Sequence, residues 1–161
     1  MLDTQIYDLI VSTRGMVRLL NLLTDQGRLV ILSTFVQENE LASIRGEVKR
    51  REILRVKRTK VFSAAGMYGV TPYGEFPYGS DGSEAGLPVS RVVSLTGKHW
   101  QDALIACTAS AEAEVLVTED KRLHKRVADS SIRCLVWRFH QFKDYIFELS
   151  GQRSKPGSSQ D

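Results

Sequence analysis

Hydrophobic residues recur along this chain with two patterns, one typical of helices and the other of short buried strands. The helical spacing covers six segments, residues 5–12, 16–23, 34 to about 57, 100–113, 120–128 and 140–149. The strand pattern covers Met1–Leu2 and residues 28–32, 114–118 and 132–137. Strands that alternate with helices in this way predict an α/β fold with a parallel sheet and helices on both faces.

The chain is long enough for one domain. Its 161 residues, 42% of them hydrophobic, suffice for one sizeable core. Residues 66–87 break every period with repeated glycines, prolines and tyrosines, so we expect a long loop there. Residues 1–149 are therefore predicted to form the domain, followed by a disordered tail at residues 150–161.

Composition and charge say more about the cellular location of the protein than about its binding partner. The formal net charge of +3 permits a polyanionic partner without demanding one. No apolar run is long enough to span a bilayer, and the N-terminus lacks a signal-peptide pattern. Cys107 and Cys134 each lie in an apolar run, where buried thiols are expected, so a cytoplasmic location fits best. His124 and His140 have no partners at zinc spacing.

Four acidic residues stand where a parallel sheet places its functional site, at the carboxyl ends of the strands. Asp3 follows the first strand, and Asp120 follows the strand that ends at Thr118. Asp102 opens an alanine-rich helix whose N-terminal dipole favours an ionised carboxylate. Glu40 lies in the first turns of the helix after residues 28–32. Acids that converge from separate segments suggest a metal site.

Such a cluster has a chemical use. Mg²⁺ and Mn²⁺ prefer oxygen ligands, and without an ion the carboxylates would repel one another. A bound ion can activate water for in-line attack on a phosphodiester and stabilise the charge on the departing oxygen. No side-chain nucleophile is then required, so the sequence predicts hydrolysis of a nucleic acid by metal-activated water.

Three of these acids also have a purely structural explanation, which is an alternative to the metal site. Aspartate is a preferred N-cap at strand-to-helix junctions, so Asp3, Asp102 and Asp120 can each serve as a helix cap. We weigh their joint occurrence in favour of the metal site.

Glu38 and Glu40 point in nearly opposite directions on a helix, so only one of them can face the site. The Glu-Leu pair at residues 40–41 favours Glu40, which leaves Glu38 a secondary candidate. Glu47 is expected to pair with Arg51 one turn further along the solvated face.

The segment Lys49–Lys60 is the strongest concentration of positive charge, and it either lies along an RNA backbone or forms a solvated helix face. Lys98 and His99, just before Asp102, are secondary candidates for phosphate contact, although a histidine beside a tryptophan is more often a packing residue. Four aromatic residues of the long loop either stack on bases or anchor the loop: Tyr68, Tyr73, Phe76 and Tyr78.

Several motifs occur together in an order that resembles the PIN domain family. They are LDT at residues 2–4, EL at residues 40–41, DALIA at residues 102–106 and VLVTED at residues 115–120. The match extends over nearly the whole chain, and residues 102–120 are its most specific part. Gln5 and Glu119 stand where the family more often has asparagine.

The resemblance implies a three-layer fold with a parallel sheet of about five strands, and a Mg²⁺- or Mn²⁺-dependent ribonuclease similar to the toxins of bacterial toxin-antitoxin pairs. It implies that Asp3, Glu40, Asp102 and Asp120 take the metal-site positions, with Thr118 helping to hold the last of them. An antitoxin protein and a homodimer follow from the resemblance alone.

Two other functions were weighed. A PIN-like fold can serve as a binding or assembly module with weak or no catalysis, but the presence of all four acids disfavours a degenerate site. A receiver or phosphatase of similar topology fits worse, because Asp3 has no second acid two residues later and no fitting lysine motif follows a strand.

Overall fold

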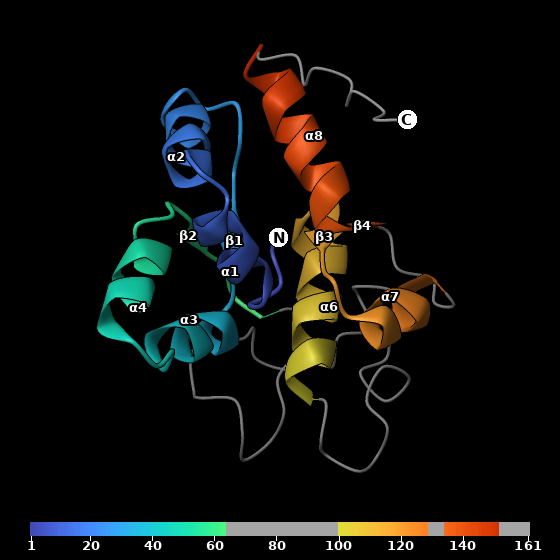
Figure 1. The fold of residues 1–161 in the computed structure, drawn as a ribbon. Helices are drawn as coiled ribbons and strands as arrows, with labels where there is room; N and C mark the ends of the chain where they lie inside the picture. The colour runs from blue at the N-terminus through green and yellow to red at the C-terminus, as the bar shows by residue number, and fades with distance from the viewer. Residues whose placement is uncertain (64–99, 129–133, 152–161) are drawn as a thin grey trace, which may run out of the picture.

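A computed structural model of the chain describes residues 1–63, 100–128 and 134–151 (Figure 1). Its helices are α1 (Ile6–Ser12), α2 (Met16–Asp25), α3 (Phe35–Ala42), α4 (Glu47–Leu54), α6 (Trp100–Glu112), α7 (Lys121–Ala128) and α8 (Phe139–Leu149). Its strands are β1 (Leu32–Ser33), β2 (Thr59–Lys60), β3 (Val115–Val117) and β4 (Leu135–Trp137). The chain is therefore a mixed α/β protein, as the alternating pattern predicts.

The strands pair in parallel, but they do not form the single sheet of about five strands that we expected. β1 pairs with β2, and β3 pairs with β4, as two separate two-stranded sheets within the described residues. The first segment is joined to β3 by one bridge between Leu2 and Val117. Backbone hydrogen bonds run along this contact: the Val117 N–H donates to the Met1 carbonyl at 3.0 Å, and the Asp3 N–H donates to the Val117 carbonyl at 2.9 Å.

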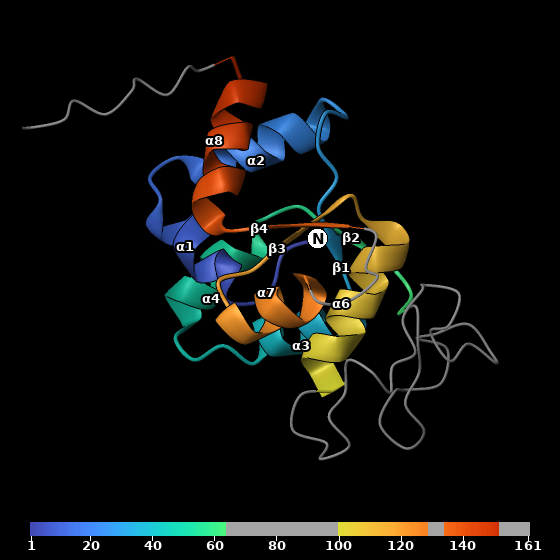
Figure 2. The same ribbon diagram turned by 90° about the vertical axis from the view of Figure 1, so that its right-hand side faces the viewer.

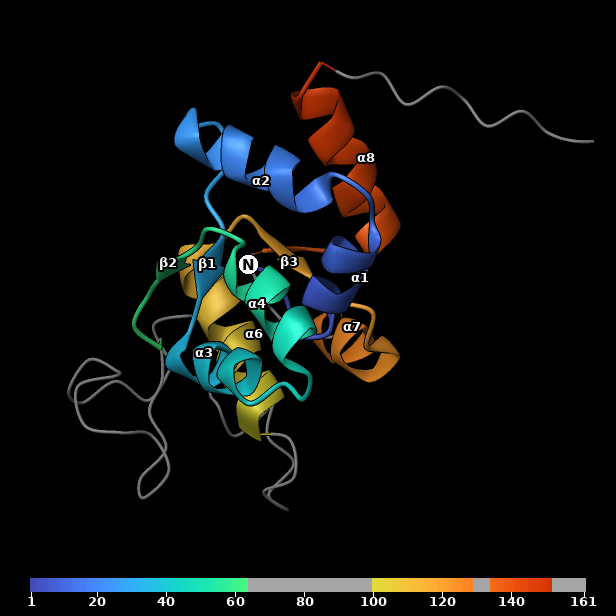
Figure 3. The same ribbon diagram turned by 60° about the vertical axis from the view of Figure 1, so that its left-hand side comes forward.

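Helices lie on both sides of the strands. α2 and α8 occupy one side, and α3, α6 and α7 the other (Figures 2 and 3). One group of buried residues includes Leu2 and Val117 together with Leu20 of α2 and Ile146 of α8. A second group joins the small residues of α6 to Leu116 of β3, and the N-terminal segment contributes to both groups. This arrangement places the helices that carry the predicted acids on one side of the strands.

The segment from residue 34 to about 57 is not one helix. α3 begins with a capping box in which the Thr34 hydroxyl accepts from the Gln37 backbone and the Gln37 side chain accepts from the Thr34 backbone. The Gln37 amide also donates to the Leu2 carbonyl at 2.5 Å, which ties α3 to the N-terminal segment. α4 begins after Gly46, whose φ of 93° favours glycine and interrupts the helix.

Two strand predictions also need correction. Residues 28–32 were expected to form a strand, but β1 is Leu32–Ser33. Val30 is 62% exposed, and the Arg28 guanidinium donates to the Leu149 carbonyl of α8 instead of entering a strand ladder. β2 was missed because its two residues, Thr59 and Lys60, are both exposed and show no apolar signal.

The structure describes some of the remaining predicted features and not others. Cys107 and Cys134 are free and buried, as predicted. Ser150 and Gly151 end α8 through hydrogen bonds to its last turn, whereas residues 152–161 and the expected loop at 66–87 lie outside the described residues. None of the helices in the described ranges is long and apolar enough to cross a membrane.

Candidate carboxylate site

Asp3 is held at the end of the first segment by side chains from two parts of the chain. It is 9% exposed, and its Oδ2 accepts from the Thr118 hydroxyl at 2.6 Å and from the Gln5 amide at 2.8 Å. Gln5 and not Asp3 is the N-cap residue of α1. The carboxylate therefore makes side-chain contacts across the strand ends, which the alternative of a simple helix cap does not explain.

Glu40 of α3 faces the same strand end. Its Oε2 accepts from the Thr4 hydroxyl at 2.5 Å, so the residue after Asp3 links the two acids. Burial raises the pKa of the Glu40 carboxyl; the hydrogen bond from Thr4 opposes this shift, and the charges of Asp3 and Asp102 add to it. Among the described groups that act on Glu40, none is a cation. The site thus carries negative charge that these groups do not neutralise.

Asp102 approaches from α6. It lies in the first turn of that helix, where the helix dipole favours its ionised form, and its charge reaches Glu40. α6 lies against α3 through Leu104, which packs with Phe35 and Val36. The structure therefore brings Asp3, Glu40 and Asp102 within electrostatic reach of one another from three separate segments.

Asp120 has a different role in the described geometry. Its Oδ1 accepts from the backbone of Arg122 at 2.6 Å and of Leu123 at 3.2 Å, so it caps the start of α7. Its own N–H donates to the Thr118 hydroxyl at 3.0 Å, and Thr118 in turn donates to Asp3. Thr118 therefore connects Asp120 to the other acids, while the helix-cap alternative describes what the Asp120 carboxylate does here.

The fit of a divalent ion can be judged from the donors. Carboxylate oxygens are the ligands that Mg²⁺ and Mn²⁺ prefer, and the negative charges of Asp3 and Asp102 that act on Glu40 suit a cation. Within the described part of the chain, however, no three histidine, cysteine, aspartate or glutamate side chains are grouped closely enough to hold one ion. The chemistry of the donors fits, but their described positions do not close around an ion.

Glu38 faces away from these acids. Its carboxylate forms an ion pair with Arg58 at 2.5 Å and 2.9 Å, and the hydrogen bond from Arg58 lowers the pKa of Glu38. The guanidinium lies 5.7 Å from the centre of the Tyr7 ring, which is fully buried. The two glutamates thus point in different directions, as helical geometry requires, and Glu40 is the one directed at Asp3.

The basic segment Lys49–Lys60 is largely neutralised by ion pairs. They are Lys49–Asp8, Arg51–Glu47 and Arg55–Glu52 at 2.9 Å each, and Lys57–Asp25 and Arg58–Glu38 at 2.5 Å each. The expected pair between Glu47 and Arg51 is confirmed. Of the two explanations for this segment, these pairs favour the solvated helix face over an RNA contact.

Two polar residues near the acids were not predicted from the sequence to be site residues. Thr4 donates to Glu40, and Gln5 donates to Asp3 and, at 3.4 Å, to the Thr118 hydroxyl. Their position directly after Asp3, at a strand end, was the available signal. The candidates Lys98 and His99, and the aromatic residues of the long loop, lie outside the described residues.

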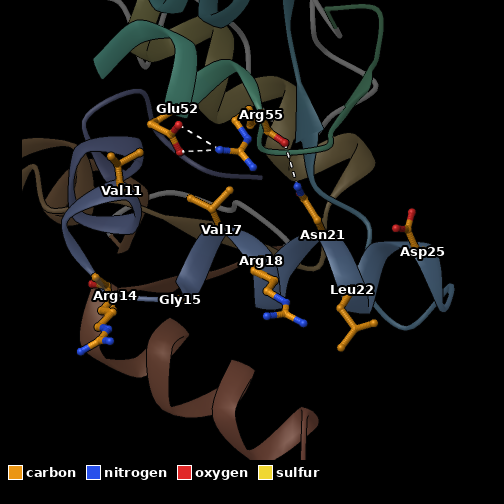
Figure 4. A pocket seen from close by; sticks show the side chains of 11 residues that line it. Val11, Arg14, Gly15, Val17, Arg18, Asn21, Leu22, Asp25, Glu52 and Arg55 are labelled. Atoms are coloured by element: carbon orange, nitrogen blue, oxygen red, sulfur yellow. Dashed lines mark hydrogen bonds and ion pairs between the residues drawn. The ribbon is translucent and has the colours of Figure 1, made fainter. Parts of the chain in front are cut away.

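Two cavities among the described residues do not contain the acids. One, of about 560 Å³, lies between α1, α2 and α4, where Arg14 and Arg18 point away from the Glu52–Arg55 pair (Figure 4). The other, of about 540 Å³, lies between residues 28–32, the starts of β3 and β4, and α8. The candidate site at the strand ends therefore lies outside both of these cavities.

Comparison with known proteins finds no family model, no curated protein and no solved structure that matches this chain.

Proposed function

We propose that this protein is a Mg²⁺- or Mn²⁺-dependent ribonuclease that hydrolyses RNA phosphodiester bonds at the cluster of Asp3, Glu40 and Asp102. One observation carries the proposal. Burial and the charges of the other two acids together raise the pKa of Glu40, which is the electrostatic situation that a bound cation relieves. Three acids that come from three separate segments and act on one another at one strand end are better explained by a shared ligand than by the fold alone.

The PIN-like architecture is part of the proposal. Parallel pairing throughout, the bridge that sets Leu2 beside β3, and helices on both sides of the strands support it. A sheet in the order β2, β1, first segment, β3, β4 would unite the two described sheets. An antitoxin and a homodimer remain expectations drawn from the family resemblance.

Each residue has a task in this proposal. Asp3, Glu40 and Asp102 would supply the oxygen ligands, and Asp120 would reach the ion if its carboxylate left the start of α7. Thr118 and Gln5 orient Asp3, and Thr4 orients Glu40. The bound ion would supply the charge that activates water and stabilises the departing oxygen.

The test is cleavage of labelled RNA by the purified protein with Mn²⁺ or Mg²⁺, compared with chelator. We expect Asp3→Asn and Asp102→Asn to lower the rate on the order of 100-fold or more, since even groups that only orient metal ligands contribute 10- to 100-fold. Glu47→Gln is the matched control, because Glu47 is an exposed acid paired with Arg51 on α4. Cleavage that persists in chelator or in Asp102→Asn would contradict the proposal.

A catalytically weak binding module is the second candidate, and two observations favour it. Asp120 is occupied as a helix cap, and no three acids of the described residues are grouped around one ion. Calorimetry with Mn²⁺ separates the two candidates. Metal binding that disappears in Asp3→Asn supports the nuclease, whereas no metal binding and no cleavage support the binding module.

A further inference from the structure

Helix α7 presents a group of cations that have no acidic partners. Lys121, Arg122 and Lys125 are all exposed, and no carboxylate of the described residues forms an ion pair with any of them. Leu123, between them in sequence, is 3% exposed and packs among the small residues of α6 and Leu116 of β3. α7 is thus fixed to the core by one face while its basic residues extend into solvent.

The rest of the described chain makes this helix distinctive. The cations of α4 and the segment that follows it are mostly paired with acids, and Arg138 contacts Glu119. Paired charges attract a polyanion less strongly, because the neighbouring carboxylate offsets the charge of the cation and repels phosphate. By this criterion, the positive charge of α7 is available for binding, whereas most of that in the segment Lys49–Lys60 is not.

The position of α7 adds to its charge. The helix begins directly after Asp120, whose carboxylate holds its first turn, and Thr118 joins Asp120 to Asp3. Lys121 and Lys125 are one helical turn apart, so they extend the positive charge about 6 Å along the helix axis. A polyanion that approaches the acids would be repelled by them, and adjacent cations offset this repulsion over about 8–10 Å.

Two arginines near α2, for which the described residues show no ion pair, do not share this position. Arg14 and Arg18 line the cavity between α1, α2 and α4, and α2 lies on the opposite side of the strands from α7 (Figures 2 and 4). A strand of RNA bound there would not reach Asp3 without passing around the sheet. Of α7 and the pair Arg14 and Arg18, α7 is therefore the one that combines exposed positive charge with a position beside the acids.

We infer that the exposed face of α7, formed by Lys121, Arg122 and Lys125, binds the phosphate backbone of the RNA and leads the strand to the acids. This assignment rests on the proposed function and specifies how its substrate is held. Contacts of this kind fix orientation and carry no sequence information, so α7 contributes to affinity for all RNA sequences alike.

The test is binding of a short labelled single-stranded RNA of mixed sequence, measured by fluorescence anisotropy with chelator present at several salt concentrations. The triple variant Lys121→Ala, Arg122→Ala, Lys125→Ala should bind on the order of tenfold more weakly at low salt. The slope of log affinity against log salt should also become shallower by about 2, since each lost phosphate contact on a single strand removes about 0.7. Alanine is a strong helix former, and the three positions are exposed, so thermal unfolding should be unchanged.

The matched control removes the same charge from paired positions, as Lys49→Ala, Arg51→Ala, Lys57→Ala. This control should retain most of the affinity and slope of the original protein. An α7 variant that binds no worse than the control overturns the assignment, as does polyglutamate that competes as well as unlabelled RNA.

Binding with chelator present does not depend on chemistry, so the two proposals can fail separately. Metal-dependent cleavage by the protein, with unchanged RNA binding in the α7 variant, overturns the role of α7 alone. Loss of RNA binding in the α7 variant of a protein that cleaves nothing supports α7 as an RNA-binding face and removes the nuclease proposal.

Discussion

The two faces of helix α3 shift the pKa of a glutamate carboxyl in opposite directions. Glu38 forms an ion pair with the guanidinium of Arg58, and its pKa is lowered, whereas Glu40, two residues later, is partly buried near Asp3 and Asp102, and its pKa is raised. The first environment satisfies a negative charge within the chain. The second disfavours the negative charge, because burial and two nearby like charges outweigh the hydrogen bond from Thr4. Sequence proximity therefore says little about role, and the partner across the helix interface decides it.

The largest effect on stability should come from removing the ion pair between Glu38 and Arg58. Arg58→Met leaves Glu38 without its partner, and removal of one member of a buried pair costs about 3–5 kcal/mol. The Glu38 side chain is 31% exposed, so water screens part of this cost, and we expect a loss of about 2 kcal/mol in the free energy of unfolding. Urea denaturation at unchanged m-value measures it.

Arg51→Met is the control for this change, because its pair with Glu47 is exposed on both sides and should contribute less than about 1 kcal/mol. Equal losses in the two variants would show that the Glu38–Arg58 pair is no more than a surface contact. RNA cleavage per folded molecule should be unaffected by either change.

A smaller change, a gain in stability, is expected when Glu40 on the other face of α3 is replaced. Glu40→Gln removes a charge that lies near two like charges but keeps an acceptor for the Thr4 hydroxyl. The metal-free variant should melt at a temperature a few degrees higher than the original protein, since about 1 kcal/mol moves Tm by about 2–4 °C at this chain length. Mn²⁺ should raise the Tm of the original protein and have little effect on the variant.

The pH dependence separates the two glutamates. The pKa of Glu40 is raised in the folded state, so the folded protein binds more protons than the unfolded chain just above the ordinary carboxyl value of 4.5, and stability falls as the pH rises through that window. The advantage of Glu40→Gln should therefore grow as the pH rises above 4.5. The contribution of Glu38 is present above the ordinary value and is lost as the pH falls through its lowered pKa. Thermal melts with chelator across this range would contradict the comparison if Glu40→Gln and Arg58→Met changed stability with the same dependence on pH.

The sequence predicted the helices better than the sheet. Helices α2, α6 and α8 lie where the apolar spacing placed them, because each buries one face against the core. The break at Gly46 and strand β2 were missed, since an isolated positive φ and a two-residue exposed strand leave almost no periodic signal.

The candidate site divides in the same way. The choice of Glu40 over Glu38 as the residue directed at Asp3 could be predicted from the sequence. Helical geometry points the two side chains in different directions, and the Glu-Leu pair at residues 40–41 favours Glu40. The ion pairs of Lys49 and Lys57 could not be predicted, since their partners, Asp8 and Asp25, lie far away in sequence. Local patterns predict which way a side chain points within its own element, whereas long-range partners depend on tertiary packing.

The smallest expected effect tests the link between Thr4 and Glu40. Thr4→Val keeps the shape of the side chain but removes the hydroxyl that donates to Glu40, so stability should fall by about 1 kcal/mol. The lost hydrogen bond had opposed the effect of burial, so the pKa of Glu40 should rise further. If Glu40 must be ionised for cleavage, the acid limb of the profile of kcat/KM against pH should move to higher pH. Thr4→Ser retains a donor and should restore the original profile, whereas a profile that Thr4→Val leaves in place would separate Glu40 from the chemistry even if stability changed as expected.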